Sequence, residues 1–396
     1  MSKALDALVV LDMTSEFWSS LGVALLGDFG ARAIRVERAG ERETGDAHPP
    51  GSWNYHDELA NRNKTSLALD WGLPRGRQIL DELLRQTDVL VVDRPAAQLR
   101  EQNLDYESVT RLKPDLIYAR ASGFGPKGPD RDSPALDELA AARTGMMPIL
   151  PQPGQPPVYT GTGQMYTSVM LAFGVLAALH HRQETGEGQE VDVSLFAGNM
   201  YGASLDIQAY LAIGGERFLE PVSRLDAGNP MSGTLYMTQD GRWVTLTMPD
   251  TDRYWPSFAE MVGLDVQDSR FDTHERRCEA NRLELMQVLE EAFRQHDADH
   301  WRAAITERNL SADVIEDYSY PAHDELARRN RYIVELQHPS LGSIKTLGLP
   351  IFMSDSPARL DRAAPCLGQH SAEVLSDLLG YSEDQIAQLQ DDGVVA

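Results

Sequence analysis

The amino-terminal part of the chain alternates between short apolar runs and helical patterns, and this alternation limits the possible folds more than any other feature. Leu8–Asp12 predicts a buried strand, Phe17–Phe29 a helix that ends at Gly30, and Ala33–Glu37 the next strand. Strands separated by single helices pair in parallel, so the sequence predicts an open, doubly wound α/β domain. The alternation continues through a predicted helix and two predicted strands, at Gly76–Gln86, Val89–Val92 and Leu116–Ala119. No Gly-x-Gly-x-x-Gly sequence follows the first strand, so a dinucleotide site is not indicated.

The pattern becomes β-rich after Phe196. Two β-type runs, Gly233–Thr238 and Trp243–Thr247, flank Asp240-Gly241, which is typical of a hairpin. Amphipathic helices, a second strand pair and a terminal helix are predicted at Arg282–Gln295, Ala298–Glu307, from Ile333 onward and at Ser371–Leu379. We therefore expect a large Rossmann-like domain at 1–200, a linker at 201–225, a small α+β domain at 226–325, and a linker with a carboxyl-terminal return to the large domain at 326–396.

Composition excludes several kinds of partner. The net charge of −24 on 396 residues disfavours nucleic acid and anionic membranes. Cys278 and Cys366 are the only cysteines, and the amino terminus has no apolar signal region, so we expect a cytoplasmic protein without disulfides. Neither the histidines nor the cysteines show metal-ligand spacing, and we predict no metal.

A long apolar helix is predicted within Val158–Leu195, between a preceding loop and a glycine-rich turn that leads to a strand. Its longest apolar stretch, Val169–Leu179, is too short to cross a bilayer. No Asp or Glu occurs between Val158 and Leu179. This helix carries the run Gly174–Leu179, and the turn after it reads Thr185–Gln189.

Short motifs spread over nearly the whole chain resemble, in their order, those of the class III CoA-transferases. The matching segments are Leu11–Thr14, Gly30–Glu37, Asn63–Asp70, Leu116–Tyr118, Ser122–Gly125, Gly128–Pro129, Pro134–Asp137, Gly174–Leu179, Thr185–Gln189 and Ala364–His370. The resemblance implies a dimer of two interlocked rings. Each ring joins a Rossmann-like domain to a smaller domain. It also implies CoA, as acyl-CoA, for a substrate and a small carboxylic acid as the acceptor.

In that family an aspartate just before the long helix attacks the thioester carbon and forms a mixed anhydride, releasing CoA thiolate. The thiolate then attacks the enzyme side of the anhydride, and a second acid takes the CoA by the reverse steps. Alignment on Gly174–Leu179 without gaps places Gln164 at the aspartate position, and a slip of one residue places Gly163 there. A glutamine amide is neutral and cannot replace the carboxylate. Gln164 could instead orient a bound acyl group through hydrogen bonds, or serve only as a residue at the helix start.

Other site residues follow from the same resemblance. Asp137 stands where the transferases carry an acid that assists the nucleophile, although a carboxylate at a helix start is also stabilised by the helix dipole. Leu136 stands where the racemase branch carries a histidine, which argues against racemisation. Tyr166 could donate a proton, or it could simply pack on the helix. Trp18 begins the tripeptide that replaces a family Ala-Gly-Pro beside the acyl group, so it would narrow that channel.

Five cations lie at or near family CoA contacts and could pair with CoA phosphates, although each could also be a solvated surface charge. They are Arg38, Lys64, Arg94, Arg100 and Lys127.

Three functions remain open. The chain could be the non-nucleophilic subunit of a heteromeric CoA-transferase, with a related subunit supplying the aspartate. It could instead be an acyl-CoA hydratase, lyase or isomerase on the same scaffold, with Asp137, Tyr166 or another group as acid or base. Finally, it could be a non-catalytic CoA-thioester-binding or structural subunit. Homodimeric and heteromeric assembly are both compatible with the sequence.

Overall fold

The computed structural model describes residues 3–38, 54–215, 219–339 and 341–396. It separates into two compact units. The first comprises Met1–Met146, Tyr159–Ile213 and Glu325–Ala396, and the second comprises Met147–Val158 and Gly214–Asp324. Each unit has its own core.

The first unit is built on a parallel sheet of six strands in the order β3-β2-β1-β4-β5-β6. Its strands are β1 (Val9–Met13), β2 (Arg32–Glu37), β3 (Lys64–Ala68), β4 (Val89–Val92), β5 (Ile117–Ser122) and β6 (Gln189–Ser194). Leu11 of β1 is paired with Ile34 of β2 on one side and with Leu90 of β4 on the other. The predicted doubly wound α/β architecture is confirmed.

Helices cover both faces of this sheet. Successive strand residues point to opposite faces, so both sets of side chains are buried. Leu11 and Leu90 belong to one apolar cluster, whereas Val10 and Val89 belong to another. The first cluster involves helices α3 (Pro74–Gln86), α5 (Tyr106–Leu112), α15 (Ser371–Leu379) and α16 (Glu383–Asp391). The second involves α1 (Phe17–Asp28), α6 (Asp137–Ala141) and α8 (Thr162–Thr185).

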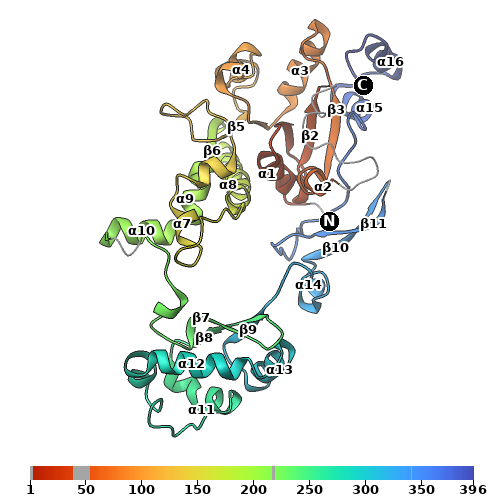
Figure 1. The fold of residues 1–396 in the computed structure, drawn as a ribbon. Coiled ribbons are helices and arrows are strands. Elements are labelled where there is room, and N and C mark those ends of the chain that lie inside the picture. The colour runs from red at the N-terminus through yellow and green to blue at the C-terminus, as the bar shows by residue number, and fades with distance from the viewer. Residues whose placement is uncertain (1–2, 39–53, 216–218, 340) are drawn as a thin grey trace. The chain divides into compact units, whose positions relative to one another are not determined.

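The carboxyl-terminal segment returns to the sheet of the first unit. The backbone N–H of His370 donates to the carbonyl of Ser66 at 3.0 Å, and that of Asp70 donates to the carbonyl of Val394 at 2.9 Å. Figure 1 shows α15 and the carboxyl terminus beside β3. Helix α16, which was not predicted, begins with a capping box between Ser382 and Gln385.

α8 is the longest helix among the described residues. It packs against α1, against α9 (Leu195–Gly202) and against the sheet. Its length and apolar composition would also suit a membrane span, but the core helix of a globular protein passes the same test. Several of its apolar side chains are exposed, as are others on α9 and on α10 (Ser204–Ile213).

The first unit also holds shorter elements at its edges. These are helices α2 (Tyr55–Asn61), α4 (Ala96–Glu101) and α14 (Glu325–Arg329), and the antiparallel pair β10 (Ile333–His338) and β11 (Gly342–Leu347). Helix α7 (Met146–Ile149) begins at the last residue of Met1–Met146, and its other residues belong to the second unit. His338 of β10 contacts Glu58 of α2 at 2.8 Å.

The second unit has a three-stranded antiparallel sheet of β7 (Ser232–Met237), β8 (Trp243–Thr247) and β9 (Ala312–Ile315). Its helices are α11 (Thr251–Met261), α12 (Arg282–Phe293) and α13 (Ala298–Arg308). The segment 147–158 also groups with the second unit, whereas we expected a large domain at 1–200. Within this segment Gln152 accepts a hydrogen bond of 3.1 Å from the backbone of Arg224.

Candidate functional site

The strand order reverses between β1 and β4, which lie side by side although five other elements separate them in the chain. Ligands of open α/β sheets bind outside the carboxyl ends of the strands at such a reversal. The segment Thr14–Glu16 leaves β1 there and enters α1, while Asp93–Pro95 leaves β4. The topology therefore directs attention to these two segments and to the elements packed beside them.

Asp93 occupies the amino end of α1. One carboxylate oxygen accepts hydrogen bonds from the backbone N–H of Ser15 at 2.8 Å and of Glu16 at 2.7 Å. The same oxygen accepts from the hydroxyl of Ser19 at 2.7 Å. Burial nevertheless raises the pKa of Asp93. Since a carboxylate already fills this helix end, a phosphate cannot bind there in the manner of a dinucleotide pyrophosphate.

α8 begins beside α1 at a glycine. Gly161 has a φ of 69° and forms the helix N-cap without a side-chain hydrogen bond. Gly163 follows, and a Cβ at that residue would lie 2.1 Å from Nδ2 of Asn199, so no larger residue fits without displacing Asn199. Gln164 is half-buried at the third helical position.

A buried polar network holds this end of α8 against its neighbours. Asp137, at the start of α6, accepts a hydrogen bond of 2.8 Å from the Asn199 amide and one of 2.7 Å from the Tyr159 hydroxyl. Burial and the hydrogen bond to Asp137 both raise the pKa of Tyr159. The network places Asp137 close to Gly163, because Asn199 contacts both positions. Its role as an acid that assists the chemistry remains a prediction.

Tyr166 does not share a face of α8 with Gln164. Two residues correspond to about 200° of rotation around a helix of 3.6 residues per turn. The Tyr166 ring lies over α9, with Cδ2 2.8 Å from the position that a Cβ on Gly202 would take. The structure therefore favours packing on α9 over proton donation beside Gln164.

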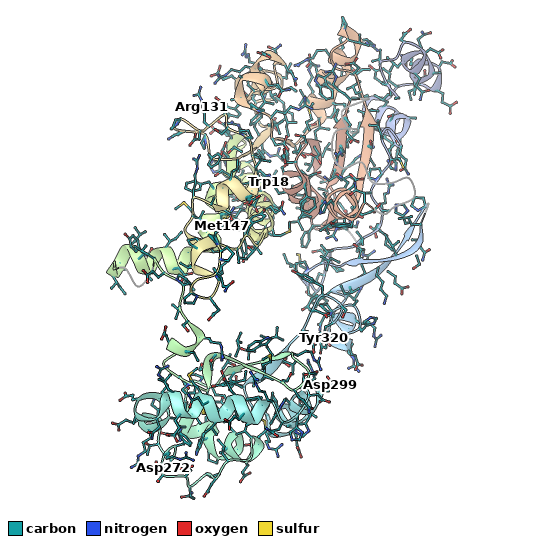
Figure 2. The ribbon with its side chains drawn as sticks, viewed as in Figure 1. Trp18, Arg131, Met147, Asp272, Asp299 and Tyr320 are labelled. Atoms are coloured by element: carbon teal, nitrogen blue, oxygen red, sulfur yellow. The ribbon has the colours of Figure 1, made fainter. Side chains whose placement is uncertain are left out.

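Trp18 lies where α1 meets α8 (Figure 2) and is only 2% exposed. Its carbonyl oxygen is 2.6 Å from the Ser168 hydroxyl, which is also 2.7 Å from the carbonyl oxygen of Gln164. Nε1 of Trp18 has no hydrogen-bond partner among the described residues. Trp18 belongs to an apolar core cluster, and its narrowing of an acyl channel stays a prediction.

Two of the predicted CoA-binding cations gather at one aromatic ring. The guanidinium carbons of Arg38 and Arg94 lie 5.3 Å and 5.6 Å from the ring centroid of Trp71. Arg38 also forms an ion pair of 2.6 Å with Asp70. Both arginines follow carboxyl ends of strands, as a phosphate-binding role requires. Lys127 and Arg100 are exposed, on the loop after β5 and on α4.

Lys64 requires a correction. Its side chain is fully buried, and Nζ lies 2.5 Å from the carboxylate of Asp12 and within 3.1 Å of oxygens of Ser20 and Asn61. Burial alone would raise the pKa of Asp12, but the charges of Lys64 and Arg35 outweigh it and hold that pKa below its usual value. Because its donors are used inside the core, Lys64 joins β3, β1 and α1 and does not contact a phosphate.

Sequence reasoning missed Glu16, Tyr159, Trp71 and Asn199, and it assigned no role to Asp93. The contacts of these residues join positions far apart in the chain, and no local sequence pattern indicates them. One signal was available, because Trp71 directly follows the motif Asn63–Asp70. No group of His, Cys, Asp and Glu among the described residues has the arrangement of a metal site.

A sequence model of the family described as CoA-transferase family III matches residues 5–371. The chain is 31% identical to a succinyl-CoA–D-citramalate CoA-transferase of Chloroflexus aurantiacus, over 98% of this chain and 97% of the relative. It is 29% identical to an (R)-2-hydroxy-4-methylpentanoate CoA-transferase of Clostridioides difficile, over 99% of both chains.

Solved structures agree with these sequence relatives. A CAIB/BAIF family protein from Brucella suis has a TM-score of 0.82 and 25% identity, over 96% of this chain and 100% of that protein. The Rv3272 protein of Mycobacterium tuberculosis shares the fold, with a TM-score of 0.77 over 93% of this chain and 98% of that protein at 24% identity. The sequence matches, which the shared fold supports, show that this chain belongs to the class III CoA-transferase family.

Proposed function

We propose that this chain is the non-nucleophilic subunit of a heteromeric acyl-CoA:carboxylate CoA-transferase. One observation carries the proposal: the first turns of α8, where the family resemblance requires an aspartate, present Gln164. No Asp or Glu occurs between Val158 and Leu179, so a shift in the alignment does not restore one. An amide cannot form the mixed anhydride, so a related subunit supplies the carboxylate.

The neighbouring carboxylate is a poor substitute for the missing one. Asp137 is 8% exposed, and each of its oxygens accepts a hydrogen bond, one from Asn199 and one from Tyr159. Both hydrogen bonds lower the nucleophilicity of the Asp137 carboxylate, and its burial restricts the approach of a thioester. Its position supports a role in holding the start of α8 rather than in forming a covalent bond.

Exposed apolar side chains in the first unit are evidence in favour of a partner subunit. They cluster on α8, α9 and α10, and include Phe173 at 72%, Tyr201 at 69%, Leu205 at 85% and Leu211 at 72% exposure. Large contiguous apolar patches are uncommon on soluble monomers and usually mark interaction sites. We propose that the related subunit covers this surface in an interlocked dimer of the family type.

The substrates in this proposal are an acyl-CoA and a small carboxylic acid in the cytoplasm. Relatives named for succinyl-CoA and citramalate, and for a branched 2-hydroxy acid, support this class. Arg38, Arg94 and Trp71 would hold the nucleotide end of CoA, with the guanidinium groups facing phosphate. Gln164 would orient a bound acyl group through its amide.

Purification of the chain from its native source, followed by transferase assays, tests the proposal. A stoichiometric related subunit with an aspartate before its own long helix, and activity only in the mixed assembly, is the expected result. Transferase activity of the isolated chain would contradict the subunit role. Hydration, elimination or isomerisation of the acyl group by the isolated chain would instead favour the second function class. Acyl-CoA binding without turnover in any assembly would favour a binding subunit.

A further inference from the structure

The amino ends of α1 and α8 lie next to each other and point the same way. The carbonyl of Trp18 in α1 contacts Ser168 of α8. One turn later, a Cβ on Gly22 would lie 2.8 Å from Leu171 of α8. Since both contacts advance in the same direction along the chain, the two helices are parallel.

This arrangement places Glu16 and Gln164 within one helical turn of each other along the helix axes. Gln164 precedes Ser168 by one helical turn, about 6 Å along the axis. Glu16 is the N-cap of α1 and its carbonyl accepts a hydrogen bond of 3.1 Å from the backbone of Ser20, so it precedes Trp18 by about 3 Å. Phe17 and Met165, the residues that follow Glu16 and Gln164, both pack on the small cluster of Leu21, Ala24 and Ala60.

Glu16 has the properties of a base rather than of a structural carboxylate. It is half-buried at the N-cap of α1, and its side chain makes no cap hydrogen bond. Its carboxylate forms no hydrogen bond or ion pair with any described residue. Burial, and the neighbouring charge of Asp93, raise its pKa, which brings a carboxylate closer to the range useful for proton transfer near neutral pH.

Donors for a developing oxyanion lie at the same place. The backbone N–H groups of Thr162, Gly163 and Gln164 donate no hydrogen bond within the described residues. Nε1 of Trp18 is a second and independent donor, because it is buried and has no partner among those residues, and the carbonyl of the same residue contacts Ser168 of α8. A buried donor without a partner is unfavourable, and a hydrogen bond to a ligand oxygen would recover that loss.

We propose that Glu16 is a general base that activates water against a bound acyl-CoA, which gives this chain a thioester hydrolase activity of its own. Glu16 takes a proton as the water oxygen bonds to the thioester carbon. The C–S bond then breaks, and the thiolate receives that proton, so the products are a carboxylic acid and CoA thiol. The inference rests on acyl-CoA binding, which is part of the proposed function, but it requires no partner subunit.

The test uses the purified chain with acetyl-CoA and cinnamoyl-CoA in ¹⁸O-water, with CoA measured by chromatography. We expect release of CoA, one ¹⁸O atom in the acid, and a loss of about 100-fold or more in Glu16→Gln. The matched control is Glu184→Gln, an exposed residue near the other end of α8, which should retain the wild-type rate. Because the Glu16 carboxylate has no partner to lose, both variants should show the thermal unfolding of the wild type.

Three results would overturn the inference: equal rates in wild type and Glu16→Gln, ¹⁸O in the Glu16 side chain after one turnover, or no hydrolysis by the wild type. Titration calorimetry with CoA separates this failure from failure of the proposed function. If the chain binds CoA but hydrolyses neither thioester, Glu16 does not act as a general base, although the chain could still serve as a transferase subunit. A chain that does not bind CoA would contradict both.

Discussion

The hydroxyl of Tyr159 donates a hydrogen bond of 2.7 Å to the carboxylate of Asp137, and this contact joins the segment before α8 to the start of α6. The bond matters because Asp137 is buried and, among the residues that the structure describes, would otherwise keep only the Asn199 amide as a donor. The network therefore fixes the end of α8 that the resemblance identifies as the reaction site.

Replacing Tyr159 by Phe should lower the free energy of unfolding by about 1–3 kcal/mol, since a hydrogen bond to a charged group is lost. Urea denaturation would measure the change. Tyr166→Phe is the matched control, because that hydroxyl has no hydrogen bond among the described residues, and its stability should remain at the wild-type value. Equal stability of the two variants would show that the Tyr159–Asp137 contact is absent in solution.

Gly163→Ala should destabilise the chain by about 1–3 kcal/mol, because the added methyl group overlaps Asn199 and breaks its bond to Asp137. Asn199→Ala should also destabilise it. In the double variant the clash is gone, so the cost should be clearly below the sum of the two single costs. Strict additivity in urea denaturation would contradict the placement of Asn199 against Gly163.

The pH dependence of stability should show the influence of Asp192 on β6. Burial raises its pKa to about 6, although Arg120 and Ser122 act in the opposite direction. The folded chain then binds more protons than the unfolded chain between pH about 4 and about 6, so this group makes stability fall as pH rises through that window. Asp192→Asn should reduce the fall, as measured by denaturation at several pH values. Asp240→Asn, on the second unit, is the control. An unchanged fall in Asp192→Asn would contradict the raised pKa.

Arg94→Ala should weaken CoA binding about 10-fold to 100-fold in titration calorimetry, because a charge-assisted contact to phosphate is lost. The loss should shrink at high salt. Arg85→Ala, in the last turn of α3, is the control and should leave the affinity unchanged. Equal affinities of the two variants would place CoA elsewhere than beside Trp71.

The fold could be predicted further than the site. Apolar runs such as Val89–Val92 and the helix at Phe17–Asp28 are local signals, and each was predicted within one or two residues. The site depends on contacts between distant positions. Asp93 accepts a hydrogen bond from the backbone of Glu16, which lies 77 residues earlier in the chain at the start of α1. Tyr159 donates a hydrogen bond to Asp137, which lies 22 residues earlier. Lys64 is a further example. Its charge and its motif indicated a phosphate contact, but its partner is Asp12, which lies 52 residues away in the chain and could not be identified from the local sequence.

In our proposal the carboxylate that carries CoA belongs to a related subunit and not to this chain. Intact-mass measurement of the native assembly after exposure to acyl-CoA without an acceptor acid tests this most directly. We expect a mass increase for covalently bound CoA on the related subunit and none on this chain, while Gln164→Asp in this chain should permit an adduct on it. A CoA adduct on the wild-type chain would contradict the proposal.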